Sequence, residues 1–326
     1  MTAASAKQNS GPLGGAMPGP DGTSERLSDG GATTGPAAQP RARGPLIATR
    51  RNKVRALRWL AVPLVLFVLV TIFGPMFYEF DPVAVNVMAR SRPPLTRLAD
   101  GSMTWLGTDQ LGRDILGQLL LGARVSLLVG VATIVIGGGA GTVLGAVAGY
   151  AGKTIDNVIM RLADIQLSIP PIVLAILLMA VLGQGVSTLI ITLSITRWAR
   201  FARIARSAAI SVKERDFVLA GRALGARSPR ILRRHVIPFL WSPLVVVATL
   251  EVGSVIIAEA ALSFLGLGTS AHQPSWGLVM ANGRSYLSQA WWISTFPGVA
   301  LSLVVVSIAL FGDQLRDILD PKGLSR

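Results

Sequence analysis

The sequence predicts an all-α membrane protein with six transmembrane helices. Its 326 residues are 51% hydrophobic and only 15% charged. Several apolar runs are long enough to cross the roughly 30 Å hydrocarbon core of a bilayer. Basic residues gather at the ends of these runs, and cytoplasmic flanks of membrane spans are typically rich in Lys and Arg. Membrane topology therefore explains the net charge of +14 more simply than nucleic-acid binding does.

The N-terminal region, residues 1–50, is expected to be a disordered cytoplasmic tail. Residues 1–44 are rich in Gly, Pro, Ala, Ser and Thr, and they have too few large apolar side chains to offset chain entropy. The apolar core begins only near Trp59, so a secretory signal is not expected. The basic cluster just ahead of it predicts a cytoplasmic N-terminus; its members are Arg50, Arg51, Lys53, Arg55 and Arg58.

Six apolar spans follow the tail. They are expected at 59–78, 124–149, 157–182, 186–206, 240–266 and 293–312. Alternation from a cytoplasmic N-terminus places segments 79–123 and 267–292 outside. Three divisions are expected after the tail. Residues 51–123 form the first helix and an outer segment, and residues 124–312 form a transmembrane core that includes the cytoplasmic loop 207–238. Residues 313–326 form a cytoplasmic C-terminal tail.

The segment between the fourth and fifth spans is strongly basic. Arg197–Pro238 holds eleven Lys or Arg residues against two acids. A short helix over 216–224 is expected to end at Gly225, because glycine readily adopts the left-handed conformation of a helix C-cap. Ser228 and the proline after it are typical of a second helix start, and Pro238 is expected to end that helix.

The first short helix of this loop has an apolar face. Leu219, Ala220, Ala223 and Leu224 lie on one side of it. We therefore expect the loop to dock against a soluble partner on the basic side of the membrane. The alternative is a basic patch that only contacts the lipid surface.

Four glycines repeat every four residues along the second span. Gly137, Gly141, Gly145 and Gly149 share one face of a helix, and small residues let two helices approach closely in a membrane. This face is therefore expected to serve helix packing.

Two acids lie inside the fifth span. Glu251 and Glu259 are eight residues apart, and a charge at membrane depth is costly unless it faces a cavity or a partner. They either line a polar pathway or join spans through hydrogen bonds, and the sequence leaves both alternatives open.

No cofactor, metal or catalytic site is expected. The chain has no Cys, and His235 and His272 lie far apart without ligand-like spacing. Gly152-Lys153-Thr154 resembles the end of a phosphate-binding loop, but Val147 stands where its first glycine is required. The chain is therefore not expected to hold a nucleotide site of its own.

The loop resembles the coupling loop of ABC importer permeases, whose motif is Glu-Ala-Ala, three residues, Gly, nine residues, Ile, one residue, Leu-Pro. Gly225 and Pro238 fall at the matching distance, with Ala220 at the first alanine and Ile237 at the leucine. The sequence departs from the motif at three positions: Leu219 replaces the glutamate, Gly221 the second alanine and His235 the isoleucine.

Three further segments resemble the C-type permease subunits of dipeptide and oligopeptide importers. They are Trp105–Asp114 in the outer segment, Glu259–Gly268 with Pro274–Gly277 beyond it, and Gly312–Pro321 near the C-terminus. The resemblance covers about residues 57–323, and four motifs occur in the family's order.

The resemblance implies a type I ABC importer permease fold in a bacterial plasma membrane, with both termini cytoplasmic. It also implies four protein partners: a second homologous permease, two cytoplasmic ABC ATPases and an extracytoplasmic substrate-binding protein. This chain would form half of the pathway of an ATP-driven peptide importer. The residues implied to couple to the ATPase are Ala220, Gly221, Arg222, Ala223, Leu224, Gly225, Arg227, Arg230, Ile237 and Pro238.

Without the motif glutamate, docking is expected to depend on apolar packing and on Arg222, Arg227 and Arg230. Nickel chelates, glutathione or other small solutes are alternative cargoes of related permeases. A proton-coupled carrier acting alone through Glu251 and Glu259 is the alternative from another functional class.

Overall fold

The computed structural model describes residues 46–78, 81–99, 101–226, 228–270 and 272–319. The side chains of 46–56 and of Arg222 are also outside the description. The disordered tail is expected mainly on residues 1–45, which lie outside the described residues. Helix α1 begins at Leu46, so the last five residues of the tail expected over 1–50 lie at its start.

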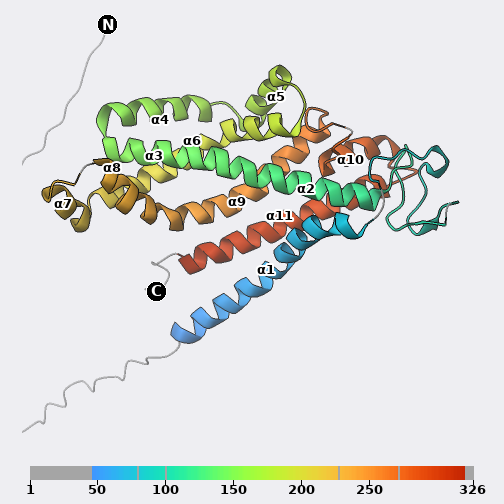
Figure 1. Cartoon of the computed structure of the whole chain (residues 1–326), viewed down its shortest axis with the longest axis horizontal. Helices are drawn as coiled ribbons and strands as arrows, with labels where there is room; N and C mark the ends of the chain where they lie inside the picture. The colour runs from blue at the N-terminus through green and yellow to red at the C-terminus, as the bar shows by residue number, and fades with distance from the viewer. Residues whose placement is uncertain (1–45, 79–80, 100, 227, 271, 320–326) are drawn as a thin grey trace, which may run out of the picture. The chain divides into compact units, whose positions relative to one another are not determined.

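The described chain is mostly helical, apart from the irregular outer segment between α1 and α2 (Figure 1). Its first half contains α1 (Leu46–Phe77), 3₁₀ helix η1 (Val87–Ala89), strands β1 (Thr96–Arg97) and β2 (Met103–Thr104), α2 (Ile115–Thr133), π-helix η2 (Ile134–Gly138), α3 (Gly139–Ala151), α4 (Lys153–Leu167) and α5 (Pro171–Leu182). The second half contains α6 (Val186–Lys213), α7 (Asp216–Ala223), α8 (Ser228–Ile231), π-helix η3 (Leu232–Val236), α9 (Ile237–Phe264), α10 (Trp276–Gly283), 3₁₀ helix η4 (Arg284–Tyr286) and α11 (Trp292–Leu319). β1 and β2 pair antiparallel in the outer segment.

Four helical stretches are long and apolar enough to cross a membrane by themselves. They are Leu57–Phe77, Ile115–Ala151, Ser228–Phe264 and Trp292–Leu319. The bent pair α4–α5 makes a fifth if it is one span. The fourth expected span lies on α6, which is continuous over 28 residues but carries arginines that lower its hydropathy. The all-helical membrane fold is therefore confirmed.

The third expected span is not one continuous helix. α4 and α5 meet at an angle of 89°, and Pro170 adopts an extended conformation directly before Pro171, the first residue of α5. A proline disfavours the helical conformation of the residue before it and lacks the N–H that a helix interior needs. Two consecutive prolines therefore break the span expected over 157–182.

The glycine face of the second span packs directly on α6. A Cβ added at Gly137, Gly141, Gly145 or Gly149 would meet the carbonyl oxygen of Ser194, Trp198, Ala202 or Arg206 at 2.7, 2.2, 2.1 and 2.7 Å, respectively. Both series advance by four residues, so the two helices run parallel with their backbones in close approach. The small-residue packing predicted from the sequence thus joins two spans of this same chain.

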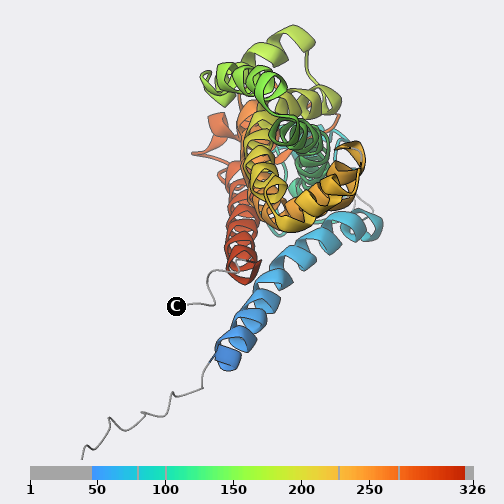
Figure 2. The same cartoon turned by 90° about the vertical axis from the view of Figure 1, so that its left-hand side faces the viewer.

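At the edge of the described bundle opposite α4 and α5 lie α1 and α11 (Figure 1). They pack together, and α1 also contacts α2 at the edge of the bundle (Figure 2). Their exposed side chains are largely apolar, as lipid-facing helices require; examples are Val65, Leu66 and Leu303.

Candidate functional site

Helix α7 is anchored to the bundle by one side. Val218 is completely buried in a cluster with Tyr150, Val212, Ile231 and Val236. The ring of Phe217 stacks on Phe239 at the start of α9, with 5.3 Å between centroids and 23° between planes. These contacts hold α7 in a defined orientation against α6 and α9.

The opposite side of α7 has no cover in the described structure. Leu224 is 88% exposed and Leu219 is 49% exposed, and Ala220 and Ala223 are exposed beside them. An apolar face held outward by a buried anchor is typical of an interaction surface.

The end of α7 has the predicted cap. Gly225 has φ +80°, and the N–H of Ala226 donates to the carbonyl of Gly221 at 3.0 Å. This 6→1 hydrogen bond across a left-handed glycine is the Schellman arrangement. The left-handed conformation predicted for Gly225 is confirmed, and it sets the direction in which the chain leaves α7.

Pro238 does not end the second loop helix, which corrects the expectation from the sequence. α8 continues through π-helix η3 into α9, and Pro238 lies in the first turn of α9. The π turn directly before it accommodates the proline, which has no N–H to continue the regular helical hydrogen-bond pattern. The π turn thus separates the basic segment from the apolar span without a helix break. Ile237, the other motif position, is the first residue of α9.

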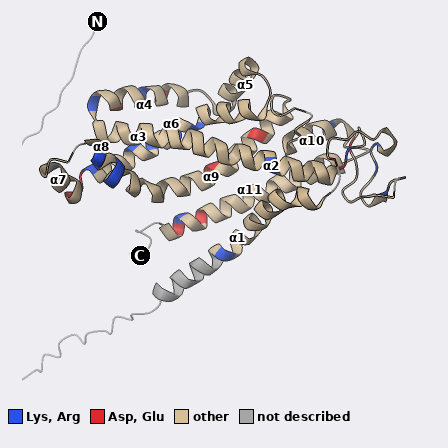
Figure 3. Ribbon diagram, viewed as in Figure 1, with Lys and Arg blue, Asp and Glu red and all other residues tan. Residues whose placement is uncertain are grey.

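The basic residues of this loop gather around α8 and η3, at the end of the bundle where α7 lies (Figure 3). Arg230, Arg233 and Arg234 are all exposed around Pro229. Arg227 lies outside the described residues, as does the side chain of Arg222. Of the three arginines that the resemblance implies in docking, only Arg230 has a side chain within the described part of the structure.

Glu251 forms ion pairs with two arginines of α6. The buried Arg197 donates to its Oε2 at 3.1 Å and to the hydroxyl of Ser254 at 3.1 Å. Arg200 donates to the other carboxylate oxygen. Both arginines lie in the expected fourth span, but the sequence pattern alone does not pair them with Glu251.

Glu259 is fully buried and binds hydroxyl groups. Ser126 of α2 and Ser263 of α9 each donate to its carboxylate at 2.8 Å. The acid therefore connects α2 and α9 within this chain. The structure does not bring Glu251 and Glu259 together: one contacts α6 and the other α2.

Helix α6 is also joined to α4 by two ion pairs. Arg206 binds the carboxylate of Asp156 through two nitrogens, and Arg203 binds Asp164 at 2.5 Å. The partners lie 39 and 50 residues apart in the chain, so local spacing does not identify them.

The outer motif around Asp109 organises the local backbone. Its Oδ1 accepts from the N–H groups of Leu111 and Arg113, both at 2.8 Å, while Oδ2 accepts from Gln118 at 3.1 Å. Asp114 caps α2 by accepting from the N–H of Gly117 at 2.7 Å. This motif therefore fixes where the second spanning helix begins.

Asp114 also accepts a hydrogen bond from the hydroxyl of Tyr78 at 2.9 Å. Burial raises the pKa of Asp114, although the hydrogen bonds from Gly117 and Tyr78 act in the opposite direction. Burial and the neighbouring carboxylate also raise the pKa of Tyr78.

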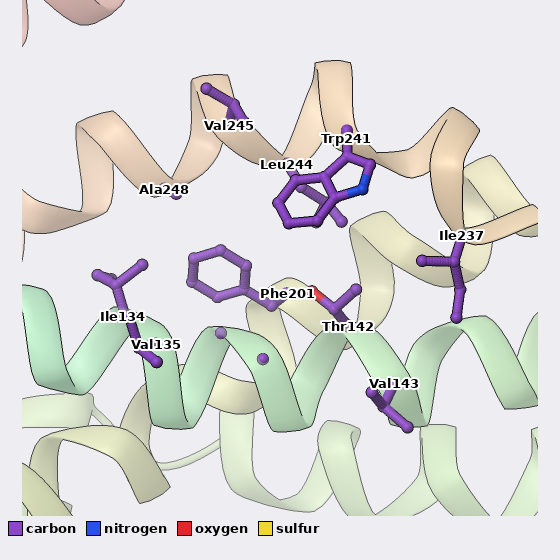
Figure 4. Close-up of a pocket in the computed structure, with 12 residues that line it drawn as sticks. Ile134, Val135, Thr142, Val143, Phe201, Ile237, Trp241, Leu244, Val245 and Ala248 are labelled. Atoms are coloured by element: carbon purple, nitrogen blue, oxygen red, sulfur yellow. The ribbon is translucent and has the colours of Figure 1, made fainter. Parts of the chain in front are cut away.

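An apolar groove lies between α9 and the α2–α3 helix, with Phe201 of α6 facing it (Figure 4). Trp241, Leu244 and Val245 line one side, and Val135 and Val143 line the other. Thr142 supplies the one side-chain hydroxyl of the lining. The groove therefore suits packing against another apolar surface and does not suit a polar solute.

These features define an integral membrane protein of packed helices with an anchored interaction helix exposed at one end. Residues 141–323 match the family described as binding-protein-dependent transport system inner membrane component. The chain belongs to this family. It is therefore a multi-pass inner-membrane permease component of a transport system.

Curated relatives match most of the chain. The probable D,D-dipeptide transport system permease protein DdpC of Escherichia coli is 38% identical over 263 residues, which are 81% of this chain and 86% of that protein. The oligopeptide transport system permease protein OppC of Bacillus subtilis is 37% identical over 277 residues, 85% and 88% of the two chains. A chain of the inward-facing MetNI methionine ABC transporter matches at 20% identity with a TM-score of 0.47, over 62% of this chain and 94% of that chain.

Proposed function

We propose that this chain forms half of the translocation pathway of an ATP-driven peptide importer. Its relatives are named as permeases for dipeptides and oligopeptides, which supports peptides as cargo. The proposed partners are a second homologous permease, two cytoplasmic ATPases and an extracytoplasmic binding protein.

The observation that carries the coupling part of this proposal is the exposed apolar face of α7. A helix whose Val218 side is buried and whose Leu224 side is exposed can transmit a movement of a docked ATPase to α6 and α9. Gly225 fixes the exit direction of the chain. Docking without the motif glutamate would depend on Leu219, Leu224 and the nearby arginines.

The proposed orientation places α7, α8 and both termini in the cytoplasm. The support is the exposed arginine cluster around α8, because Lys and Arg accumulate on cytoplasmic flanks. The contacts of Glu251 and Glu259 favour helix pairing over a proton-coupled carrier, since each carboxylate is already held by two side chains of this chain.

The test is peptide uptake into proteoliposomes that hold this chain, its second permease and the two ATPases, with the binding protein outside. We expect uptake only when ATP reaches the ATPases and the binding protein is present. A matched preparation with a hydrolysis-deficient ATPase is the control. Uptake by this chain alone, driven by a proton gradient, would overturn the proposal.

A further inference from the structure

Helix α6 carries a half-exposed charge at membrane depth. At 1.5 Å per residue, Glu251 lies about 16 Å along α9 from residue 240, and Arg200 lies about 9 Å along α6 from residue 206. Residues 240 and 206 are the expected inner edges of the two spans, so both side chains start inside the membrane. Arg200 donates to Glu251, so its guanidinium lies at the same depth. The side chain of Arg200 is 50% exposed, whereas that of Glu251 is 6% exposed.

A guanidinium at this depth needs polar surroundings. Exposure to hydrocarbon costs several kcal/mol, so intramembrane charges face water-filled cavities or partners. The exposed surfaces of α1 and α11 show the contrast, because Leu66 and Leu303 present apolar side chains there. The exposed side of Arg200 therefore does not face lipid.

The cluster around Glu251 has an excess positive charge. Among the described side chains, Arg197 and Arg200 share this one carboxylate, and the third member, Ser254, is neutral. Two guanidinium groups with one carboxylate leave one positive charge without a counter-ion. An anionic group that approached Arg200 from its exposed side would balance it.

The charged surface continues toward the end of the bundle that holds α7. Arg203 and Asp164 pair while both remain half-exposed, at 52% and 51%. Arg206 and Asp156 follow near the start of α4. Arg197, Arg200, Arg203 and Arg206 are three residues apart, and each step of three residues shifts the side chain by about 60° around the helix axis. Their side chains therefore move around α6 from the side that faces α9 to the side that faces α4.

We propose that the translocation pathway runs along this charged surface of α6 and that the Arg197–Arg200–Glu251 cluster binds a carboxylate group of the solute in transit. This inference deepens the proposed function and rests on it. Arg200 supplies the exposed guanidinium, and Glu251 positions it.

The first test asks whether water reaches Arg200. The native chain has no cysteine, so Arg200→Cys can be labelled selectively with membrane-impermeant methanethiosulfonates in the assembled transporter, in vesicles of both orientations. Ser302→Cys on α11 is the matched control, because Ser302 is exposed on an apolar helix surface beside Leu303. Arg200→Cys leaves the Arg197 guanidinium paired with the Glu251 carboxylate, so the charges of these two groups still balance.

We expect Arg200→Cys to react about tenfold or more faster than Ser302→Cys, since thiolate formation needs a polar environment. An equal, slow reaction at both positions would overturn the pathway assignment. It would mean that the second permease or another partner covers Arg200.

The second test uses chemical rescue of charge. Uptake of a dipeptide with a free carboxylate is expected to fall about tenfold in Arg200→Gln and Arg200→Cys. Arg200→Lys should retain most of it. Treating Arg200→Cys with the aminoethyl reagent restores a positive charge and should restore uptake, whereas the sulfonatoethyl reagent should not. Equal effects of the two reagents would overturn the carboxylate-binding role and leave only a structural one.

The two proposals fail in different ways. A wild-type complex without ATP-dependent peptide uptake would contradict the proposed function. The difference in labelling rate between Arg200→Cys and Ser302→Cys does not depend on the cargo. Even if the complex did not transport peptides, this difference would show whether the pathway follows α6.

Discussion

Gly145 and Ala202 bring two helices of the bundle into backbone contact. A Cβ at position 145 would lie 2.1 Å from the carbonyl oxygen of Ala202. No rotamer change can relieve such a contact, because the obstructing atom belongs to the backbone of α6. The packing of α3 on α6 therefore depends on the absence of a side chain at this position.

Gly145→Ala should destabilise the protein by about 1–3 kcal/mol through overpacking. Gly141→Leu and Gly145→Leu should reduce assembly of the complex further, without a change in cargo preference. Gly139→Ala is the matched control, because no atom lies within 4 Å of its added Cβ. Melting temperature in detergent and complex yield measure the effect. Full assembly of both leucine variants with altered cargo preference would place this face in the pathway instead.

Gly225→Val should uncouple transport while leaving the protein inserted. Its φ of +80° costs a β-branched residue about 1–2 kcal/mol, although open space surrounds the position. The strain falls on the exit from α7 and should misdirect the docking surface. The measurements are peptide uptake and co-purification of the ATPases.

Gly221→Ala is the control for that variant. No atom lies within 4 Å of the added Cβ, and alanine favours a helix over glycine by about 1 kcal/mol. We expect normal uptake in Gly221→Ala. Normal uptake together with normal ATPase co-purification in Gly225→Val would count against the docking role.

Glu259→Ala should lose complex stability by about 1–3 kcal/mol, because Ser126 and Ser263 would lose their common acceptor. Glu259→Gln should be nearly silent, since an amide retains a hydrogen-bonding oxygen at similar volume. Uptake and complex yield for both variants are the measurements. A stable Glu259→Gln complex that no longer transports would instead assign the acid to the pathway.

The stability contributed by Asp114 should depend on pH. Burial raises its pKa above the ordinary value of 3.8, so its contribution is fully present below 3.8 and is lost as the pH rises through the folded-state pKa. The melting temperature of the wild type relative to Asp114→Asn should therefore fall as the pH rises from 3.8. If the melting temperature of the wild type increased with pH relative to that of Asp114→Asn, burial would not raise the pKa of Asp114.

The parts of the fold predicted from the sequence are those that local rules decide. The left-handed Gly225 and the packing face around Gly145 follow from glycine spacing and backbone sterics, and the apolar lengths indicate most spans. The break in the third span had a local signal as well, because Pro170 and Pro171 are adjacent.

The ion pairs of α6 could not be predicted in the same way. Which acid meets Arg197 or Arg206 depends on how α4, α6 and α9 pack, and no spacing rule links residues about 50 positions apart. The continuation of α8 through η3 into α9 was missed for a different reason. A proline at 238 is compatible with both a helix end and a first helical turn.

Cross-linking from Leu224 shows directly whether an ATPase docks on the apolar face of α7. In this chain without native cysteine, Leu224→Cys places a thiol on the α7 apolar face at a position that is 88% exposed. A heterobifunctional cross-linker attached there should join the chain to an ATPase subunit in the assembled complex. Trp241→Cys, exposed on α9 beside the apolar groove, should not do so. We expect an ATPase adduct from Leu224→Cys alone. A complex that transports normally and gives no such adduct would show that the ATPase does not dock on this face.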